Sequence, residues 1–177
     1  RMLEGIEAVC TEQDYNILLS TPRLQDGKPD DHYLRLLQSG YIEGVIAIDN
    51  IQSFSFAQSS ESHNVPAVIL GHHAGDYRVE TDNFAGGVLL MEHVLSYGHR
   101  RIGIISVNPD VNMAIQLRLD GMLSAVDDAN LDIEIPMMDS DFSVKGGAQA
   151  ARQLLQDHPD LSVIICLNDR MAIGAIS

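Results

Sequence analysis

The sequence predicts an α/β fold built from doubly wound parallel sheets, and two observations lead to that prediction. Short apolar runs alternate along the chain with segments of helical spacing, and several of the runs are apolar at consecutive positions. Consecutive apolar residues are typical of strands that helices cover on both faces. Alternation of strands with helices indicates parallel pairing, because two parallel strands need a crossover connection between them.

Six apolar runs are expected to form the strands. They comprise residues 15–19, 44–48, 67–70, 101–107, 133–137 and 162–167. All of them are far shorter than the roughly 20 apolar residues of a membrane-spanning helix. The sequence therefore predicts no membrane partner.

Three segments between these runs repeat apolar residues at steps of four, three and four, which places one stripe on one helix face. The stripes are Phe84, Val88, Met91 and Leu95; Ile115, Leu119, Met122 and Val126; and Val144, Ala148, Ala151 and Leu155. Residues that favour the N-cap position precede each of them, namely Thr81 or Asp82, Asn112 and Ser143. Residues 21–31 and 71–82 are expected to be loops.

The charge balance excludes one class of function. The 177 residues contain 11 Lys and Arg against 25 Asp and Glu, which gives a net charge of −14. Nucleic-acid backbones and acidic membranes are bound by clustered basic residues, so these residues are not expected to contact either. Cys10 and Cys166 lie in apolar surroundings and are interpreted as core thiols of a reducing compartment rather than a disulfide or metal pair.

Motifs of catalysis and of metal or cofactor binding are missing from the sequence. It has no dinucleotide-binding or phosphate-binding glycine loop, no nucleophile elbow and no zinc-protease histidine pair. A calcium-like start at Asp139 fails, because Val144 and Ala150 stand where that loop needs Gly and Glu. His72 and His73 are adjacent, so their side chains diverge. We therefore expect no catalytic residue, no cofactor and no metal, and the protein is not expected to be an enzyme.

Polar residues follow the carboxyl ends of the expected strands, which is where open α/β sheets bind ligands. They are Asp49, Asn50, Asp82, Asn83, Asn108, Asn112, Arg118, Asp139, Asp141, Phe142, Asn168 and Asp169. Carboxylates, amides, a guanidinium and an aromatic face suit a small hydroxylated or nitrogenous ligand. Structural roles are the alternative: Asp82 and Asn168 as helix caps only, Arg118 as a surface residue and Phe142 as core. His99 is expected to fix a turn after Gly98.

At these residues the chain resembles the regulatory core of LacI/GalR-type bacterial transcriptional regulators, which share the fold of periplasmic sugar-binding proteins. Four stretches carry the likeness, and their order and spacing are more specific than any one of them. They are residues 65–71; residues 82–87 followed by 95–105; residues 118–122; and residues 164–175.

The resemblance implies a two-lobed fold with lobes of residues 1–97 and 98–177, meeting near Tyr97 and Gly98. It implies that an effector binds between the lobes and controls how a cytoplasmic homodimer presents DNA-binding headpieces, which lie outside this chain, to operator DNA. The effector is expected to be sugar or nucleobase-like. Carried over residue by residue, the expected contacts are Arg118 as a clamp, Asn168 as a pocket amide, Asp82 as a cleft acid of the amino lobe, Phe142 as a stacking ring and Asn112.

Departures from the family pattern leave the effector open. Gly71 stands where several relatives have an acid, and Asn112 and Ala114 stand where some base-binding members have polar contacts. The resemblance also implies that the chain is truncated at both ends. Two alternatives stay open: a periplasmic sugar-binding receptor of an ABC transporter, and a sugar-processing α/β enzyme. The stretch Gly98–Ile102 favours the regulator.

Overall fold

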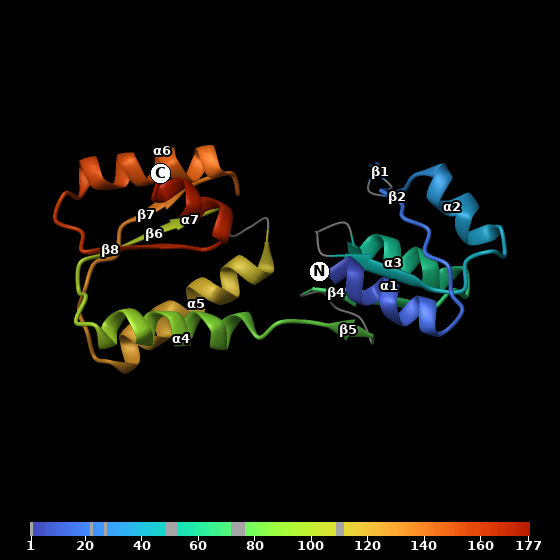
Figure 1. The fold of residues 1–177 in the computed structure, drawn as a ribbon, viewed down its shortest axis with the longest axis horizontal. Coiled ribbons are helices and arrows are strands. Elements are labelled where there is room, and N and C mark those ends of the chain that lie inside the picture. Colours follow the sequence, from blue (N-terminus) through green and yellow to red (C-terminus); the bar gives the residue numbers. More distant parts are fainter. Residues whose placement is uncertain (1, 22, 27, 49–52, 72–76, 109–111) are drawn as a thin grey trace. The chain divides into compact units, whose positions relative to one another are not determined.

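The chain divides into two units, which we describe separately. One comprises residues 1–47 and 52–68, and the other comprises residues 48–51 and 69–177. The computed structural model describes all residues except 1, 22, 27, 49–52, 72–76 and 109–111 (Figure 1). Among the described helices, none combines the length and the apolar character that a bilayer crossing requires.

The described residues of the first unit form helices and short strands. In chain order the elements up to residue 70 are α1 (Met2–Glu12), β1 (Leu24–Gln25), β2 (Lys28–Pro29), α2 (Asp31–Gln38), β3 (Val45–Ile48), α3 (Ser53–Ser62) and β4 (Ala67–Leu70). The last residue of β3 and the last two residues of β4 belong to the second unit. β1 and β2 form a small antiparallel hairpin inside the segment expected to be a loop, with Leu24 opposite Pro29. The core cluster is small and consists of Tyr33, Leu37, Phe56 and Val65.

A buried hydrogen-bond network joins α2 to α3 in this core. The Tyr33 hydroxyl donates to the carbonyl oxygen of Phe56 at 3.0 Å and lies 2.6 Å from Oγ of Ser60. Ser60 is fully buried and donates to the same carbonyl at 2.9 Å. Burial raises the pKa of the Tyr33 hydroxyl, because the charged phenolate is disfavoured away from water.

The prediction of a strand at residues 15–19 is wrong. These residues adopt no strand, and Tyr15, Ile17, Leu18 and Leu19 are exposed. A strand exists only when a neighbouring strand accepts and donates its backbone hydrogen bonds, and no described strand pairs with this segment. An apolar run predicts the side-chain pattern of a strand but not the presence of a partner.

The second unit has a parallel sheet between two layers of helices. β6 (Ile102–Ser106) lies between β7 (Met137–Asp139) and β8 (Val163–Cys166), and all three run parallel. In Figure 1, α4 (Asn83–Ser96) and α5 (Met113–Asp128) lie on one face, and α6 (Val144–Asp157) and α7 (Asp169–Ala175) on the other. This is the doubly wound α/β architecture that the sequence predicts.

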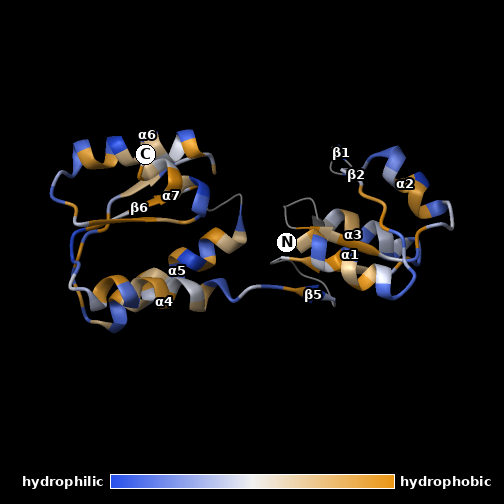
Figure 2. Ribbon diagram, viewed as in Figure 1, coloured by the Kyte–Doolittle hydropathy of each residue, from blue (hydrophilic) through white to orange (hydrophobic). Residues whose placement is uncertain are grey.

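β6 is the centre of this unit. All five of its residues are buried, and three of them are isoleucines, whereas α6 alternates between hydrophobic and hydrophilic residues in Figure 2. A further short strand, β5 (Arg78–Val79), pairs in parallel with β4 through Ile69 and Leu70. The predicted strands at residues 44–48, 67–70, 101–107 and 162–167 are confirmed.

The strand predicted at residues 133–137 is displaced toward the carboxyl end. Residues 133–136 form no strand, although Ile133 and Ile135 pack against the core. Pro136 has no N–H to donate, and β7 begins at the next residue, Met137. The carbonyl of Pro136 still accepts from the N–H of Ile104 at 3.0 Å, so the ladder starts there.

Only one of the three predicted apolar stripes coincides with the buried face of its helix. In α5, Ile115, Leu119, Met122 and Val126 are all buried. In α4 the buried face is Asn83, Gly87, Met91 and Val94, and in α6 it is Gly147, Ala150, Ala151 and Leu154. Phe84 and Leu155 of the predicted stripes are 42% and 45% exposed. A pattern of large apolar residues cannot detect a helix face that packs through glycine.

Those glycines let helix backbones touch. A Cβ atom at Gly87 of α4 would collide with the backbone carbonyl of Arg118 in α5, and one at Gly121 of α5 would collide with that of Phe84. The second helix pair repeats the arrangement, with Gly147 against Met171 and Gly174 against Val144. Each pair therefore packs more closely than side chains at these positions would permit.

The observed division of the chain differs from the predicted meeting of lobes near Tyr97 and Gly98. Helix α4 packs on α5 and belongs to the second unit, so the division falls between Val68 and Ile69. Gly98 has a positive φ of 82° and follows the C-cap of α4, where it turns the chain into β6. Gly98 therefore marks the end of α4, and the two lobes of residues 1–97 and 98–177 stay a prediction.

The two cysteines are free and partly buried. Cys166 packs against the core of the second unit, and burial raises the pKa of its thiol. Cys10 lies on α1, which has no buried residue. The prediction of core thiols therefore holds for Cys166 alone.

Candidate functional site

Arg118 joins three elements of the second unit. It projects from α5 and is half-buried. Its Nε donates to Oδ1 of Asn83 in α4 at 2.7 Å, and its Nη1 donates to the carbonyl oxygen of Leu167, just after β8, at 2.8 Å. The alternative that Arg118 is a surface residue of a helix is therefore wrong.

The guanidinium keeps further donors for a ligand. Arginine has five N–H bonds, of which two are used here, and within the described part of the chain the other three have no hydrogen-bond acceptor. Both acceptors are neutral, and no described carboxylate forms an ion pair with Arg118. A fixed cation with three unused donors suits a ligand that presents oxygen acceptors.

Asn83 is the residue that sequence reasoning undervalued. It appears among the polar residues near strand ends, but only its neighbour Asp82 is an expected effector contact. In the structure Asn83 is 5% exposed, and its Nδ2 donates to the carbonyl of Thr81 at 3.1 Å. Its spacing of four residues from Gly87 could have placed it on the buried face of α4.

Three of the expected effector residues are helix N-caps. Asp82 accepts from the N–H of Ala85 at 2.9 Å and caps α4. The remaining two cap α5 and α7: Asn112 accepts from Ala114 at 2.9 Å and from Ile115 at 3.3 Å, and Asn168 accepts from Met171 at 2.8 Å.

The capping roles are confirmed, and they leave part of each polar group available. In each case one oxygen faces the helix, so the second carboxylate oxygen of Asp82 and the amide nitrogens of Asn112 and Asn168 face elsewhere. Asp82, placed by the resemblance in the amino lobe, lies in the second unit with the other four.

Phe142 lies on the loop after β7 and has a positive φ of 62°, an uncommon backbone conformation for an aromatic residue. It is half-buried and packs against the core cluster, so the core alternative holds in part. Its neighbour Asp141 accepts from the Ser143 hydroxyl at 2.6 Å and from the Ser143 N–H at 3.1 Å. These bonds lower the pKa of the Asp141 carboxyl.

The parallel sheet gathers these residues at one edge. β7, β6 and β8 end in the same direction, Phe142 follows β7, Asn112 follows β6, and Asn168 follows β8. Arg118 reaches this edge through the carbonyl of Leu167. The arrangement is the carboxyl-end position at which α/β sheets hold ligands.

Some of the other predicted residues lie outside the described residues or away from this edge. Asp49, Asn50, His72 and His73 are outside the described residues. Nδ1 of His99 lies 2.9 Å from Oγ of Ser162, which fixes the turn before β6 as predicted. Among the residues that the structure describes, no group of three His, Cys, Asp or Glu side chains could hold a metal ion.

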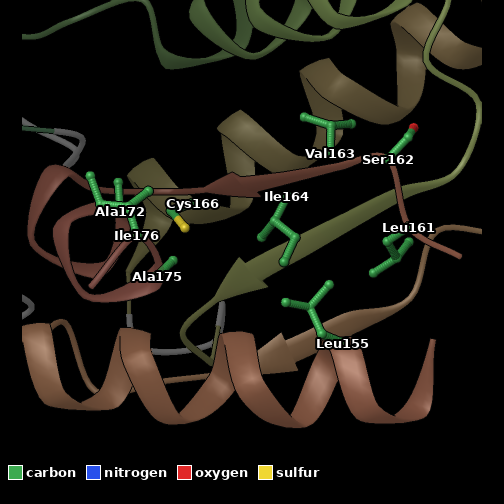
Figure 3. Close-up of a pocket in the computed structure, with 9 residues that line it drawn as sticks. All are labelled: Leu155, Leu161, Ser162, Val163, Ile164, Cys166, Ala172, Ala175 and Ile176. Atoms are coloured by element: carbon green, nitrogen blue, oxygen red, sulfur yellow. The ribbon is translucent and has the colours of Figure 1, made fainter. Parts of the chain in front are cut away.

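A hollow of about 340 Å³ lies along β8, between that strand, α6 and α7 (Figure 3). It is lined by Leu155, Leu161, Ser162, Val163, Ile164, Cys166, Ala172, Ala175 and Ile176. Most of its lining side chains are aliphatic, and the lining includes none of the five expected effector residues. It flanks the strand at an edge of the described β7-β6-β8 sheet rather than the polar carboxyl edge.

The chain is 26% identical over 177 residues to the HTH-type transcriptional repressor PurR of Actinobacillus pleuropneumoniae serotype 5b, covering 98% of this chain and 52% of that protein. It therefore spans about half the length of the curated relatives it matches.

Solved structures share the fold. A LacI family transcriptional regulator from Enterococcus faecium with bound ribose superposes with a TM-score of 0.80 at 24% identity, covering 98% of this chain and 63% of that one. An ABC transporter periplasmic solute-binding protein from Actinobacillus succinogenes with bound D-allose gives a TM-score of 0.78 at 20% identity, covering 99% and 66%.

One family model covers the whole chain. It describes the periplasmic binding proteins and the sugar-binding domain of the LacI family, and it matches residues 1–177. A match over that range, with the parallel sheet and its polar carboxyl edge, shows that the chain belongs to this family.

Proposed function

We propose that this chain is the effector-sensing core of a bacterial transcriptional regulator. A small ligand binds at the carboxyl edge of the β7-β6-β8 sheet and controls operator binding by a headpiece outside the chain. The observation that carries the proposal is the half-buried Arg118, which two neutral acceptors hold while three of its donors stay unused by described residues.

The residues at this edge, together with Asp82 at the N-cap of α4, favour a sugar or a nucleobase-like ligand. Asn112 and Asn168 offer amide nitrogens, Asp82 offers a carboxylate oxygen, and Phe142 offers an aromatic ring. Amides and carboxylates pair with hydroxyls and ring nitrogens, and aromatic rings cover apolar ligand faces. The relative from Enterococcus faecium was solved with ribose, which makes pentoses the first ligands to test.

The proposal treats the protein as a cytoplasmic homodimer and a binding module rather than an enzyme. With a net charge of −14, the chain itself is not expected to contact DNA, so operator binding belongs to the headpiece. The ligand changes DNA affinity only if it binds two arrangements of the protein unequally.

A periplasmic receptor of an ABC transporter is the second candidate, because a solute receptor with bound D-allose shares the fold. The two functions differ in what lies upstream of the sensing core: a helix-turn-helix headpiece in a regulator, and a secretory signal peptide in a receptor. The natural upstream sequence distinguishes them directly.

The test uses the protein at its full natural length. A thermal-shift screen with D-ribose, D-allose, cellobiose, adenine and guanine should raise the melting temperature with one ligand class, because a ligand that binds only the folded state stabilises it. That ligand should then change the affinity for an operator selected from a random DNA library. A ligand-induced shift in melting without any DNA binding would contradict the regulator and support the receptor.

A further inference from the structure

Arg118 binds an effector more tightly if its long side chain is already ordered. A free arginine samples many rotamers, and fixing them on binding costs free energy that the ligand contact must offset. In this structure two acceptors of the protein itself hold the guanidinium, namely Oδ1 of Asn83 and the carbonyl oxygen of Leu167. The question is which residue sets its orientation.

Asn83 presents its acceptor to Arg118 in one orientation only. Its Nδ2 donates to the carbonyl of Thr81, which turns Oδ1 toward Nε of Arg118. The opposite amide orientation would place an NH₂ group against the guanidinium and leave two donors facing each other. Asn83 is also 5% exposed, so water does not replace it easily.

The backbone of Arg118 is fixed from the same helix. Gly87 lies one turn after Asn83 on the buried face of α4, and its Cα is so close to Arg118 that a Cβ would collide with the Arg118 carbonyl. Helix α4 therefore holds Arg118 at both ends, with Gly87 at the backbone and Asn83 at the guanidinium.

We propose that Asn83 is a positioning residue, which orders the Arg118 guanidinium for the effector without contacting the effector itself. The proposal rests on the proposed function, in which Arg118 binds the ligand. It also limits how the ligand can bind. Because Nε of Arg118 already donates to Asn83, the ligand cannot bind side-on through Nε and one Nη atom. The effector oxygen must approach the two Nη atoms instead.

The first experiment needs no ligand. In the full-length protein, NMR of the arginine Nε–H groups, assigned with Arg118→Lys, should show an ordered and slowly exchanging Nε–H for Arg118. Asn83→Leu removes the acceptor at similar volume and should abolish that signal, whereas Asn83→Asp keeps an acceptor and should retain it. Val94→Ala removes buried volume from the other end of α4 and should leave the signal unchanged.

The second experiment measures affinity by calorimetry for the ligand that the screen identifies. Asn83→Leu should weaken binding about tenfold, the change that about 1.4 kcal/mol produces. Asn83→Asp should restore most of that loss, and Val94→Ala should bind like the parent protein although it is less stable. In an Arg118→Lys background, Asn83→Leu should cause little further loss.

The outcomes separate the two proposals. An Arg118 Nε–H that stays ordered in Asn83→Leu, or an equal loss of affinity in Val94→Ala, would overturn the role of Asn83. If no tested sugar or base binds, the proposed function loses its support, and the ligand-free NMR result still decides whether Asn83 orders Arg118.

Discussion

Nη1 of Arg118 donates a 2.8 Å hydrogen bond to the backbone carbonyl of Leu167, which lies 49 residues further along the chain. The bond connects the middle of α5 to the end of β8. Leu167 directly precedes Asn168, the N-cap of α7. A ligand that draws the guanidinium toward itself therefore acts on the turn that starts α7.

Replacing Arg118 should remove ligand binding while leaving the fold. We expect Arg118→Ala to weaken binding by about 1.5–3 kcal/mol, the contribution of hydrogen bonds to a charged group. Calorimetry with the ligand from the screen measures the loss, and circular dichroism checks the fold. Arg152→Ala, on the exposed side of α6, is the matched control. Unchanged affinity in Arg118→Ala would remove Arg118 from the binding site.

Adjacent glycines of α4 should respond in opposite ways to alanine. Gly87→Ala should destabilise the protein by about 1–3 kcal/mol, because the new methyl group meets the backbone of Arg118. Gly86→Ala has open space and should stabilise the helix by about 0.5–1 kcal/mol. Urea denaturation measures both, and equal effects would show that α4 and α5 do not pack as described.

The first unit should lose stability at alkaline pH through Tyr33. Burial raises the pKa of Tyr33 above its usual value of 10.0, so its contribution is complete below about pH 10 and is lost as the pH rises through the folded-state value. Tyr33→Phe should unfold more easily at pH 8 by about 0.5–1.5 kcal/mol and lose part of this alkaline dependence. Denaturation midpoints measured between about pH 8 and about pH 11 report both effects.

Tyr41→Phe serves as the control for that experiment, since Tyr41 is 90% exposed. It should change neither the midpoint at pH 8 nor the alkaline slope. An identical alkaline slope for Tyr33→Phe and the parent protein would show that Tyr33 is not the group responsible.

The N-terminus of α2 should weaken in acid through Asp30. Hydrogen bonds from the N–H of Tyr33 and the N–H of Arg23 lower the pKa of Asp30 below its usual value of 3.8. Its contribution is therefore present above that value and is lost as the pH falls through the lower folded-state value. Carbon NMR of the Asp30 carboxyl should show a midpoint below 3.8, and Asp30→Asn should flatten the acid dependence. A midpoint at or above the usual value would contradict the cap.

Sequence patterns predicted the elements whose determinants are local. The apolar runs at residues 67–70 and 162–167 correspond to β4 and β8 within one residue at each end. Asn112 and Ser143 are the N-caps of α5 and α6, as predicted. Strand composition and cap chemistry act within a few residues, so a single sequence carries them.

Features that depend on distant partners could not be predicted in this way. Residues 15–19 have the composition of a strand but lack a described partner, and Pro136 moves the start of β7 by removing a donor. Asn83 looks like a loop residue beside Asp82 until α5 supplies Arg118, 35 residues further along, as its partner. Buried faces made of glycine and asparagine carry no apolar signal.

The reciprocal glycines of α4 and α5 have a mechanical consequence. Gly87 of α4 lies against the backbone of Arg118, and Gly121 of α5 lies against the backbone of Phe84. Each helix therefore packs its backbone against a glycine of the other helix. Helices engaged in this way cannot slide along each other without steric overlap. We therefore expect α4 and α5 to move together as one rigid body when a ligand binds the Arg118 guanidinium, rather than to shift against each other.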